Sequence, residues 1–172
     1  MIDPAMADSG GPLLRRGLVG LAGLTVFGLA VELAADRHWT QAIQLIAWVA
    51  LAVATLAIVL VLGTASPARL RLARILAVAV MLSAILGIWE HVEGNHDAGA
   101  LDRNYQDSWD MLPPSTQWWL AVSKTVGPSP PLAPAALAQA GLCVLLATLR
   151  HPALATRTVD SRRQPDGSSP TT

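Results

Sequence analysis

The chain has 172 residues, with a hydrophobic fraction of 52%, a charged fraction of 14% and a formal net charge of zero. A soluble domain carries about 25% charged residues, so this composition, with a mean hydropathy of +0.44, argues against an ordinary water-soluble domain. The chain is also too short for a membrane bundle joined to a second folded domain, which leaves one compact bundle with one sizeable loop.

Four long apolar stretches dominate the sequence. They cover residues 17–35, 42–62, 73–89 and 132–149, and the third predicted helix extends to residue 91. Each is close to the ~17–25 residues that a helix needs to cross a hydrocarbon core of about 30 Å. The sequence therefore predicts an all-α integral membrane bundle of four transmembrane helices over residues 17–149. The N-terminal residues 1–16 and the polar tail 150–172 are predicted to be disordered.

Charge alternates in sign between these stretches. Arginines precede the first stretch, fill the connection between the second and the third, and follow the fourth: Arg15, Arg16, Arg69, Arg71, Arg74, Arg150, Arg157, Arg162 and Arg163. The connection between the third and fourth stretches is mainly acidic, with Glu90, Glu93, Asp97, Asp102, Asp107 and Asp110. Because Lys and Arg in short loops mark the cytoplasmic side, both termini are predicted to be cytoplasmic, in a bacterial inner membrane.

The first stretch also has some features of a cleaved signal peptide. Arg15 and Arg16 precede an apolar run, and Leu33-Ala34-Ala35 is a weak cleavage site. Glu32 lies beside that site and the apolar run is longer than most signal-peptide cores, so an uncleaved helix is the favoured interpretation.

Small residues recur at helical spacing in each stretch. Gly17, Gly20 and Gly23 do so in the first stretch, and Gly141 belongs to a similar set in the fourth. Such spacing lets helix backbones approach closely in a membrane, and it also arises from simple alanine richness. The single cysteine, Cys143, excludes a disulfide within the chain and is interpreted as a small apolar residue of the bundle.

The external loop, residues 92–131, is the segment with room for a specialised function. Ser115 follows two prolines and could act as the N-cap of a short helix over residues 116–125. That helix would carry Trp118, Trp119 and Val122, which predicts an interfacial helix on the outer leaflet.

Carboxylates and imidazoles gather where the third stretch ends, in Glu90, His91, Glu93, His96 and Asp97. Such groups suit a divalent transition metal, which is the one cofactor suggested by the sequence. The spacing is not that of a recognised zinc motif. The alternative is a solvated acidic helix end with one buried, hydrogen-bonded histidine. In either case Gly94-Asn95 is predicted to stop the helix.

A second set of polar residues lies toward the outer end of the four stretches: Glu32, Gln44, His91 and Gln139. Ionisable residues within a membrane crossing are functional candidates because charge in hydrocarbon is costly. These four side chains are predicted to form a buried polar cluster in which Glu32 pairs with His91. The alternative is that Glu32 simply reaches the lipid headgroups.

One combination of residues carries a resemblance to a known group: Gly87 to Asn95, Trp118-Trp119, Leu132-Ala-Pro134, Gly141 and Arg150-His151-Pro152. It resembles a group of small bacterial four-crossing membrane proteins described as hypothetical membrane proteins. The resemblance covers about half of the chain, from the third stretch to the end of the fourth. It implies the four-helix fold and brings no activity with it.

No motif in the sequence specifies a reaction. There is no glycine-rich phosphate loop, no nucleophile elbow and no Cys-x-x-Cys-His. The sequence therefore favours a non-enzymatic accessory or scaffold protein, whose partners are the bilayer and a membrane protein or a second copy, without nucleic acid. The alternatives are a metal- or small-ligand-binding membrane protein with a site at the outer end of helix three, and an oligomeric channel or transporter component.

Overall fold

The computed structural model describes residues 4–63, 66–149 and 151–155, which contain helices and no strand. The α-helices are α1 (Pro4–Ala35), α2 (Leu45–Leu62), α3 (Pro67–Ala98), α4 (Pro114–Val122), α5 (Leu132–Thr148) and α6 (Pro152–Ala155). Short 3-10 turns are η1 (Ala42–Gln44), η2 (Gly99–Leu101) and η3 (Trp109–Met111). The all-α prediction is confirmed.

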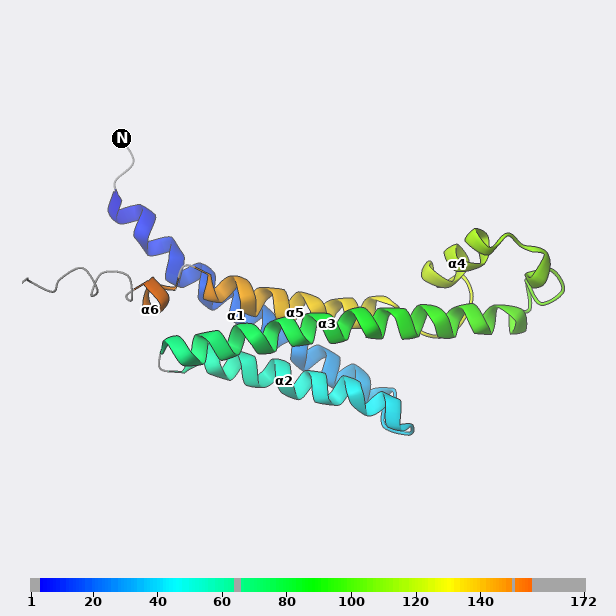
Figure 1. Cartoon of the computed structure of the whole chain (residues 1–172), viewed down its shortest axis with the longest axis horizontal. Helices are drawn as coiled ribbons and strands as arrows, with labels where there is room; N and C mark the ends of the chain where they lie inside the picture. Colours follow the sequence, from blue (N-terminus) through cyan, green and yellow to red (C-terminus); the bar gives the residue numbers. More distant parts are fainter. Residues whose placement is uncertain (1–3, 64–65, 150, 156–172) are drawn as a thin grey trace, which may run out of the picture.

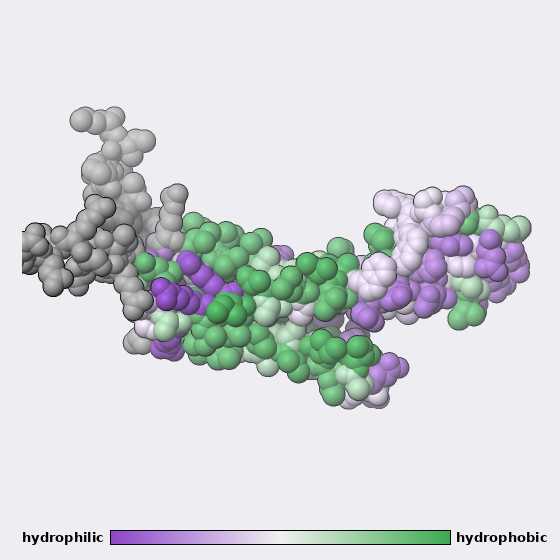
Figure 2. Space-filling model, in the orientation of Figure 1, coloured by the Kyte–Doolittle hydropathy of each residue, from purple (hydrophilic) through white to green (hydrophobic). Residues whose placement is uncertain are grey.

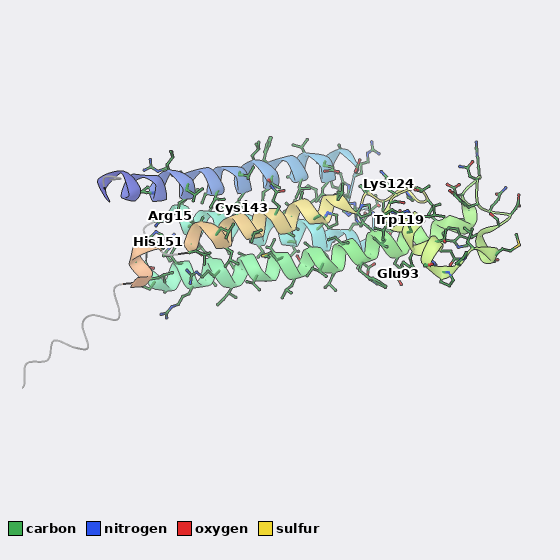
Figure 3. All side chains as sticks on the ribbon, turned by 90° about the horizontal axis from the view of Figure 1, so that it is seen from above. Arg15, Glu93, Trp119, Lys124, Cys143 and His151 are labelled. Carbon is green, nitrogen blue, oxygen red and sulfur yellow. The ribbon has the colours of Figure 1, made fainter. Side chains whose placement is uncertain are left out.

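Helices α1, α2, α3 and α5 lie side by side along the long axis of the molecule (Figures 1 and 3). Three helical stretches are long and apolar enough to cross a membrane: Gly11–Ala35, Ala42–Leu62 and Pro67–Leu101. The fourth, α5, is apolar but shorter, with 17 residues. Figure 2 shows hydrophobic residues over the bundle and hydrophilic residues toward each end.

The bundle core is built largely from small side chains. Gly141 of α5 sits so close to α3 that an added Cβ would lie 2.9 Å from the Ala77 carbonyl oxygen. The predicted close packing through small residues therefore holds for α3 and α5. It is wrong for the glycines of α1, because nothing lies within 4 Å of a Cβ added at Gly17, Gly20 or Gly23.

Helix α1 buries a different set of side chains, namely Val19, Ala22, Val26 and Leu29. It also begins earlier than predicted, at Pro4, so most of the segment expected to be disordered is helical. Pro12 lies inside this helix, where it removes one backbone hydrogen bond without ending it. Of the predicted disordered tail, Pro152–Ala155 is helical, and residues 150 and 156–172 lie outside the described part.

We call the end of the bundle at which α1 ends and α2 begins the outer end, and the opposite end the inner end. At the inner end, Arg74 of α3 donates to Thr148 at the end of α5, from Nε to Oγ1 at 3.0 Å and from Nη2 to the backbone oxygen at 2.6 Å. A cation thus satisfies a carbonyl group that a helix C-terminus leaves unpaired. Burial, together with Arg15 and Arg74, lowers the pKa of the nearby His151.

Helix α3 extends past the bundle at the outer end (Figure 1), which the sequence analysis did not predict. The expected end at residue 91 and the expected stop at Gly94-Asn95 are wrong, since the helix continues to Ala98. Its 32 residues span about 48 Å at the usual helical rise. Residues 99–131 fold back onto this extension, and we call residues 88–131 the outer subdomain.

The outer subdomain has its own small core, formed by Val92, Trp109, Ala121 and Val126. Gly99 allows its closest contact, because a Cβ there would overlap the Trp109 ring. Helix α4 covers residues 114–122, with Pro113 rather than Ser115 as the N-cap residue. Trp118 packs against Trp89, with ring centroids 5.5 Å apart, whereas Trp119 stays exposed.

Within the outer subdomain, Asn95 of α3 holds the returning segment 99–131 against the helix. Its side chain is fully buried; Nδ2 donates to the backbone oxygens of Ala121 (3.2 Å) and Ser129 (2.8 Å), and Oδ1 accepts from the Ser129 amide (2.9 Å). Gly127, at φ +80°, packs directly on Asn95, where a Cβ would collide with that residue. Because its side chain is satisfied by the returning loop, Asn95 does not compete for the helix backbone and the helix continues through it.

Candidate functional site

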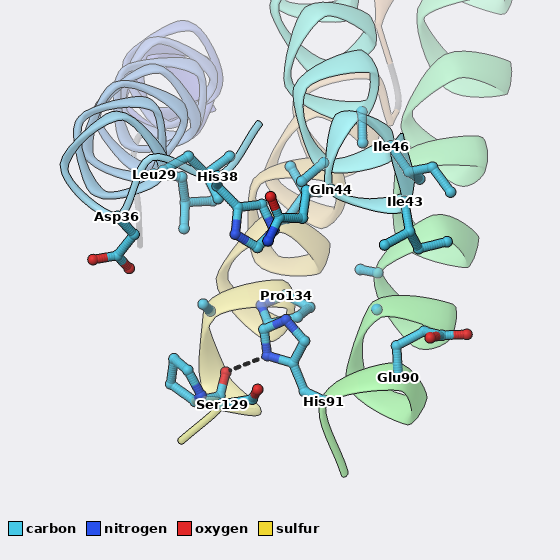
Figure 4. Close-up of a pocket in the computed structure, with 18 of the residues that line it drawn as sticks. Leu29, Asp36, His38, Ile43, Gln44, Ile46, Glu90, His91, Ser129 and Pro134 are labelled. Carbon is cyan, nitrogen blue, oxygen red and sulfur yellow. Dashed lines mark hydrogen bonds between the residues drawn. The ribbon is translucent and has the colours of Figure 1, made fainter. Parts of the chain in front are cut away.

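A pocket of about 640 Å³ opens at the outer end of the bundle (Figure 4). Residues of α1, η1 and α2 form one side. Residues of α3 and α5, with Pro128, Ser129 and Pro130 of the returning loop, form the other. Cavities of roughly 300–1,000 Å³ are typical of small-molecule sites, so the volume suits a small ligand.

The deeper part of the pocket is apolar. It is lined by side chains that lie further from the outer end of the bundle than the polar residues do, including Leu29, Ala50, Leu51, Ala84 and Leu137. Several of these belong to the bundle core. The alanines leave the space that larger side chains would fill, so the small residues of α2 and α3 create the cavity as well as the packing.

The polar side chains of the lining gather at the mouth of the pocket, beside the apolar Ile43, Pro128 and Pro130. They are Glu32, Asp36, His38, Gln41, Gln44, Glu90, His91 and Ser129. Among the described residues that line the pocket there are three carboxylates and no lysine or arginine. Apolar depth and a polar rim are the lining expected for an amphipathic ligand.

His91 is held in one orientation at this mouth. Its Nδ1 lies 2.9 Å from the backbone oxygen of Pro130, and Figure 4 shows the ring within the pocket. A carbonyl oxygen only accepts hydrogen bonds, so Nδ1 carries the proton. In the neutral ring Nε2 is therefore a hydrogen-bond acceptor.

The connection between α1 and α2 is fixed by side-chain hydrogen bonds to its backbone. Trp48 Nε1 donates to the His38 carbonyl oxygen at 2.8 Å. Gln44 Oε1 accepts from Thr40 N, Thr40 Oγ1 and Gln41 N at 2.9, 3.0 and 3.2 Å. These contacts hold His38 and Gln44 at the rim, opposite His91 (Figure 4).

Three of the four side chains predicted to form a polar cluster line this one pocket: Glu32, Gln44 and His91. Gln139 does not, and it is exposed on α5. At about 100° per residue, Gln139 points some 200° away from Leu137, which faces the cavity. The expected Glu32–His91 pair is replaced by the His91 bond to Pro130.

The predicted metal ligands are not brought together. Because α3 is helical through Ala98, consecutive residues project in different directions. His91 turns to the pocket; His96 stacks on Trp118, with ring centroids 4.3 Å apart; Glu90, Glu93 and Asp97 are exposed. Nowhere in the described part of the chain do three His, Cys, Asp or Glu residues form a group that could hold a metal ion. The prediction of a metal site at residues 90–97 therefore finds no support.

Three polar residues of the mouth were not predicted from the sequence: Asp36, His38 and Ser129. All three belong to connections between helices. The short length of the connection at residues 36–41 was a usable signal, because it holds those side chains near the end of the bundle. No local pattern marks Ser129, which reaches the mouth through the fold of the outer subdomain.

No protein-family model, curated protein or solved structure matches this chain.

Proposed function

We propose that this chain is a non-enzymatic integral membrane protein that binds a small amphipathic molecule in the pocket at its outer end. The observation that carries the proposal is the graded lining of the pocket, apolar within the bundle and polar at the rim. A molecule with an apolar body and a polar head would match both parts.

The membrane placement is supported by the three long apolar helices, most of whose residues are not covered by the rest of the chain. In the proposed arrangement α5 is a fourth crossing. Its 17 residues span about 26 Å, slightly less than a hydrocarbon core of about 30 Å, a difference that local bilayer thinning accommodates at modest cost. The arginine-rich inner end faces the cytoplasm and the acidic outer end faces outward, in a bacterial inner membrane.

The polar groups of the mouth favour binding over catalysis. The lining contains two serines, Ser83 and Ser129. Ser83 Oγ donates to the Val80 carbonyl oxygen at 2.8 Å, and within the described structure neither serine is hydrogen-bonded to a histidine. The described contacts of the pocket therefore include no serine that an adjacent histidine could activate as a nucleophile.

The test uses 1-pyrenebutanol, a neutral amphiphile whose pyrene accepts excitation energy from tryptophan. The protein is placed in nanodiscs of zwitterionic lipid, and energy transfer above that of empty nanodiscs is measured as the probe is titrated. The chain's six tryptophans are the donors, and Trp48 among them is hydrogen-bonded to the pocket rim. We expect a saturable component of one site per chain.

Two substitutions on α2 make this test specific. Ala47 lines the pocket and Ala52 is exposed on another face. Ala47→Phe should abolish the saturable component, and Ala52→Phe should leave it unchanged. A wild-type protein without saturable transfer, or equal transfer in both variants, would overturn the proposed function.

A further inference from the structure

We infer that the inner end of the bundle carries a second binding site, in which Arg15, Arg16 and His151 hold a phosphate group, as in the headgroup of an anionic phospholipid. The site is separate from the pocket at the outer end. It shares only the membrane placement with the proposed function, so the two binding sites can be tested independently.

The site is a cleft of about 190 Å³ at the inner end of the bundle. It lies between the first turns of the apolar part of α1, the last turn of α2 and the segment that joins α5 to α6; its lining residues are Arg15, Arg16, Val19, Val61, Leu62 and His151. Figure 3 shows Arg15 and His151 at this end of the molecule. One water molecule takes up about 30 Å³ of the liquid, so the cleft has room for a phosphate group and not for a whole phospholipid.

The first observation is positive charge that converges on the cleft from two helices. Burial, together with Arg15 of α1 and Arg74 of α3, lowers the pKa of His151. Within residues 11–63, 66–149 and 151–155, every aspartate and glutamate belongs to residues 32–36 or 90–110, toward the outer end. No carboxylate of that part of the chain therefore offsets the arginines, and an anion in the cleft would be attracted by both helices.

The second observation is that the polar groups of the cleft donate hydrogen bonds. A guanidinium group only donates, and its planar fork matches two oxygens of a phosphate. His151 Nδ1 accepts from the Ala153 backbone amide at 3.3 Å, so the proton of the neutral ring is on Nε2, which is a donor. The lowered pKa of His151 keeps this ring neutral near pH 7. A negatively charged group that accepts hydrogen bonds would satisfy all three side chains, and a phosphate is such a group.

The apolar border of the cleft favours a lipid as the carrier of the phosphate. Val61 and Leu62 line the cleft, and Leu62 is 68% exposed, so an acyl chain leaving the cleft would pack along the surface of α2. Basic pockets between membrane helices on the cytoplasmic side bind anionic lipid headgroups. The proposed orientation places this end of the bundle in the cytoplasm.

Arginines at this end of the chain also have a simpler role, because they mark the cytoplasmic side. Their exact positions do not matter for that role, and Arg71 would serve it as well as Arg16. A phosphate site, by contrast, depends on which arginine lines the cleft. The two roles therefore predict different results for substitutions of these two residues.

The closing experiment measures lipid binding to the purified full chain by native mass spectrometry from zwitterionic detergent micelles. The probes are dioleoylphosphatidylglycerol and dioleoylphosphatidylcholine, which have the same acyl chains and differ in net charge. We expect one phosphatidylglycerol to be retained per chain, with an affinity about tenfold higher than that of phosphatidylcholine.

Glycerol 1-phosphate, added as a competitor, distinguishes the two sources of a phosphate group. Displacement of phosphatidylglycerol would show that the headgroup chemistry is sufficient and that a soluble phosphate ester is also a ligand. Retention of phosphatidylglycerol would show that the ligand is the lipid with its acyl chains. Both results support a phosphate site at the inner end.

Arg16→Gln and Arg71→Gln are a matched pair of variants. Both arginines are exposed and lie at the inner end, and of the two only Arg16 lines the cleft. Arg16→Gln should weaken phosphatidylglycerol binding about tenfold, because it removes charged hydrogen-bond donors from the site. Arg71→Gln should leave the affinity within about twofold, since salt at about 0.15 M screens a charge outside the cleft. Both variants should fold, because both substituted side chains are exposed.

Equal affinity for phosphatidylglycerol and phosphatidylcholine would overturn the inference. Equal weakening by the two substitutions would also overturn it, because the arginines would then act only as general surface charge. Neither result affects the pyrenebutanol test of the outer pocket, which uses zwitterionic lipid and whose lining shares no residue with the cleft.

Discussion

Asn95 shows how one side chain can hold two parts of a chain together. Its amide bonds the backbone of Ala121 and Ser129, and within the described residues no buried side-chain nitrogen or oxygen is left without a partner. Unpaired groups in such a site are costly, because burial removes the water that would otherwise bond them.

Asn95→Ala is expected to loosen the outer subdomain. The substitution leaves the Ser129 amide and the Ser129 carbonyl oxygen unpaired, while the Ala121 carbonyl oxygen keeps its bond from the Lys124 amide; the cost is roughly 3 kcal/mol. Limited proteolysis of the 99–131 segment should become faster while the helical content of the bundle is kept. Asn104→Ala is the control, because Asn104 is exposed; equal cleavage rates in the two variants would contradict the role given to Asn95.

The same residue marks a limit of prediction from sequence. Gly94-Asn95 is a common helix end, and the contact that keeps Asn95 in the helix comes from Ser129, 34 positions away. A local pattern cannot register such a distant partner. The position of Glu32, Gln44 and His91 near the outer end was predictable, because the distance of a residue from a helix end can be counted from the sequence. The directions in which Gln139 and the predicted metal ligands point were not predictable, because they depend on where the helices end and how they pack.

At the scale of whole helices, glycines separate into those that pack and those that do not. Gly141 brings α5 against α3, while Gly20 of α1 faces open space. The sequence shows the same small residue in both helices, so only the arrangement of the helices tells the two roles apart.

Gly141→Ala and Gly20→Ala are therefore expected to have different effects on stability. The first forces a Cβ to within 2.9 Å of the Ala77 carbonyl oxygen and should destabilise the bundle by about 1–2 kcal/mol. The second should leave stability unchanged or raise it by up to about 1 kcal/mol, since alanine is the better helix former. Unfolding in mixed detergent micelles, followed by circular dichroism, measures both. A Gly141→Ala protein as stable as Gly20→Ala would contradict the assigned packing role.

The four predicted apolar stretches correspond to α1, α2, α3 and α5, and the order of the elements follows the sequence pattern. What the pattern did not contain is the outward extension of α3 and the fold of residues 99–131, which depend on contacts between distant segments. The proposed orientation in the membrane, with the inner end in the cytoplasm, concerns the molecule as a whole. Chemical labelling of introduced cysteines can test it.

In a cysteine-free Cys143→Ala background, Met111→Cys and Arg71→Cys place one thiol near each end, at positions that are both exposed. On intact cells, a membrane-impermeant maleimide should label Met111→Cys and should label Arg71→Cys only after lysis. The reverse pattern would invert the proposed topology, and labelling of both positions, or of neither, on intact cells would argue against α3 crossing the membrane.

The segment around Ser129 and Pro130 has a consequence for the whole molecule. It lines the pocket mouth beside His91, and its hydrogen bonds to Asn95 make it part of the outer subdomain. In the proposed function, a ligand that favours one conformation of this segment would couple occupancy of the pocket to the conformation of the outer subdomain, and such coupling is reciprocal. A molecule that binds the outer subdomain from outside would change the affinity of the pocket for its ligand. The ligand would change the affinity of the outer subdomain for that molecule by the same factor.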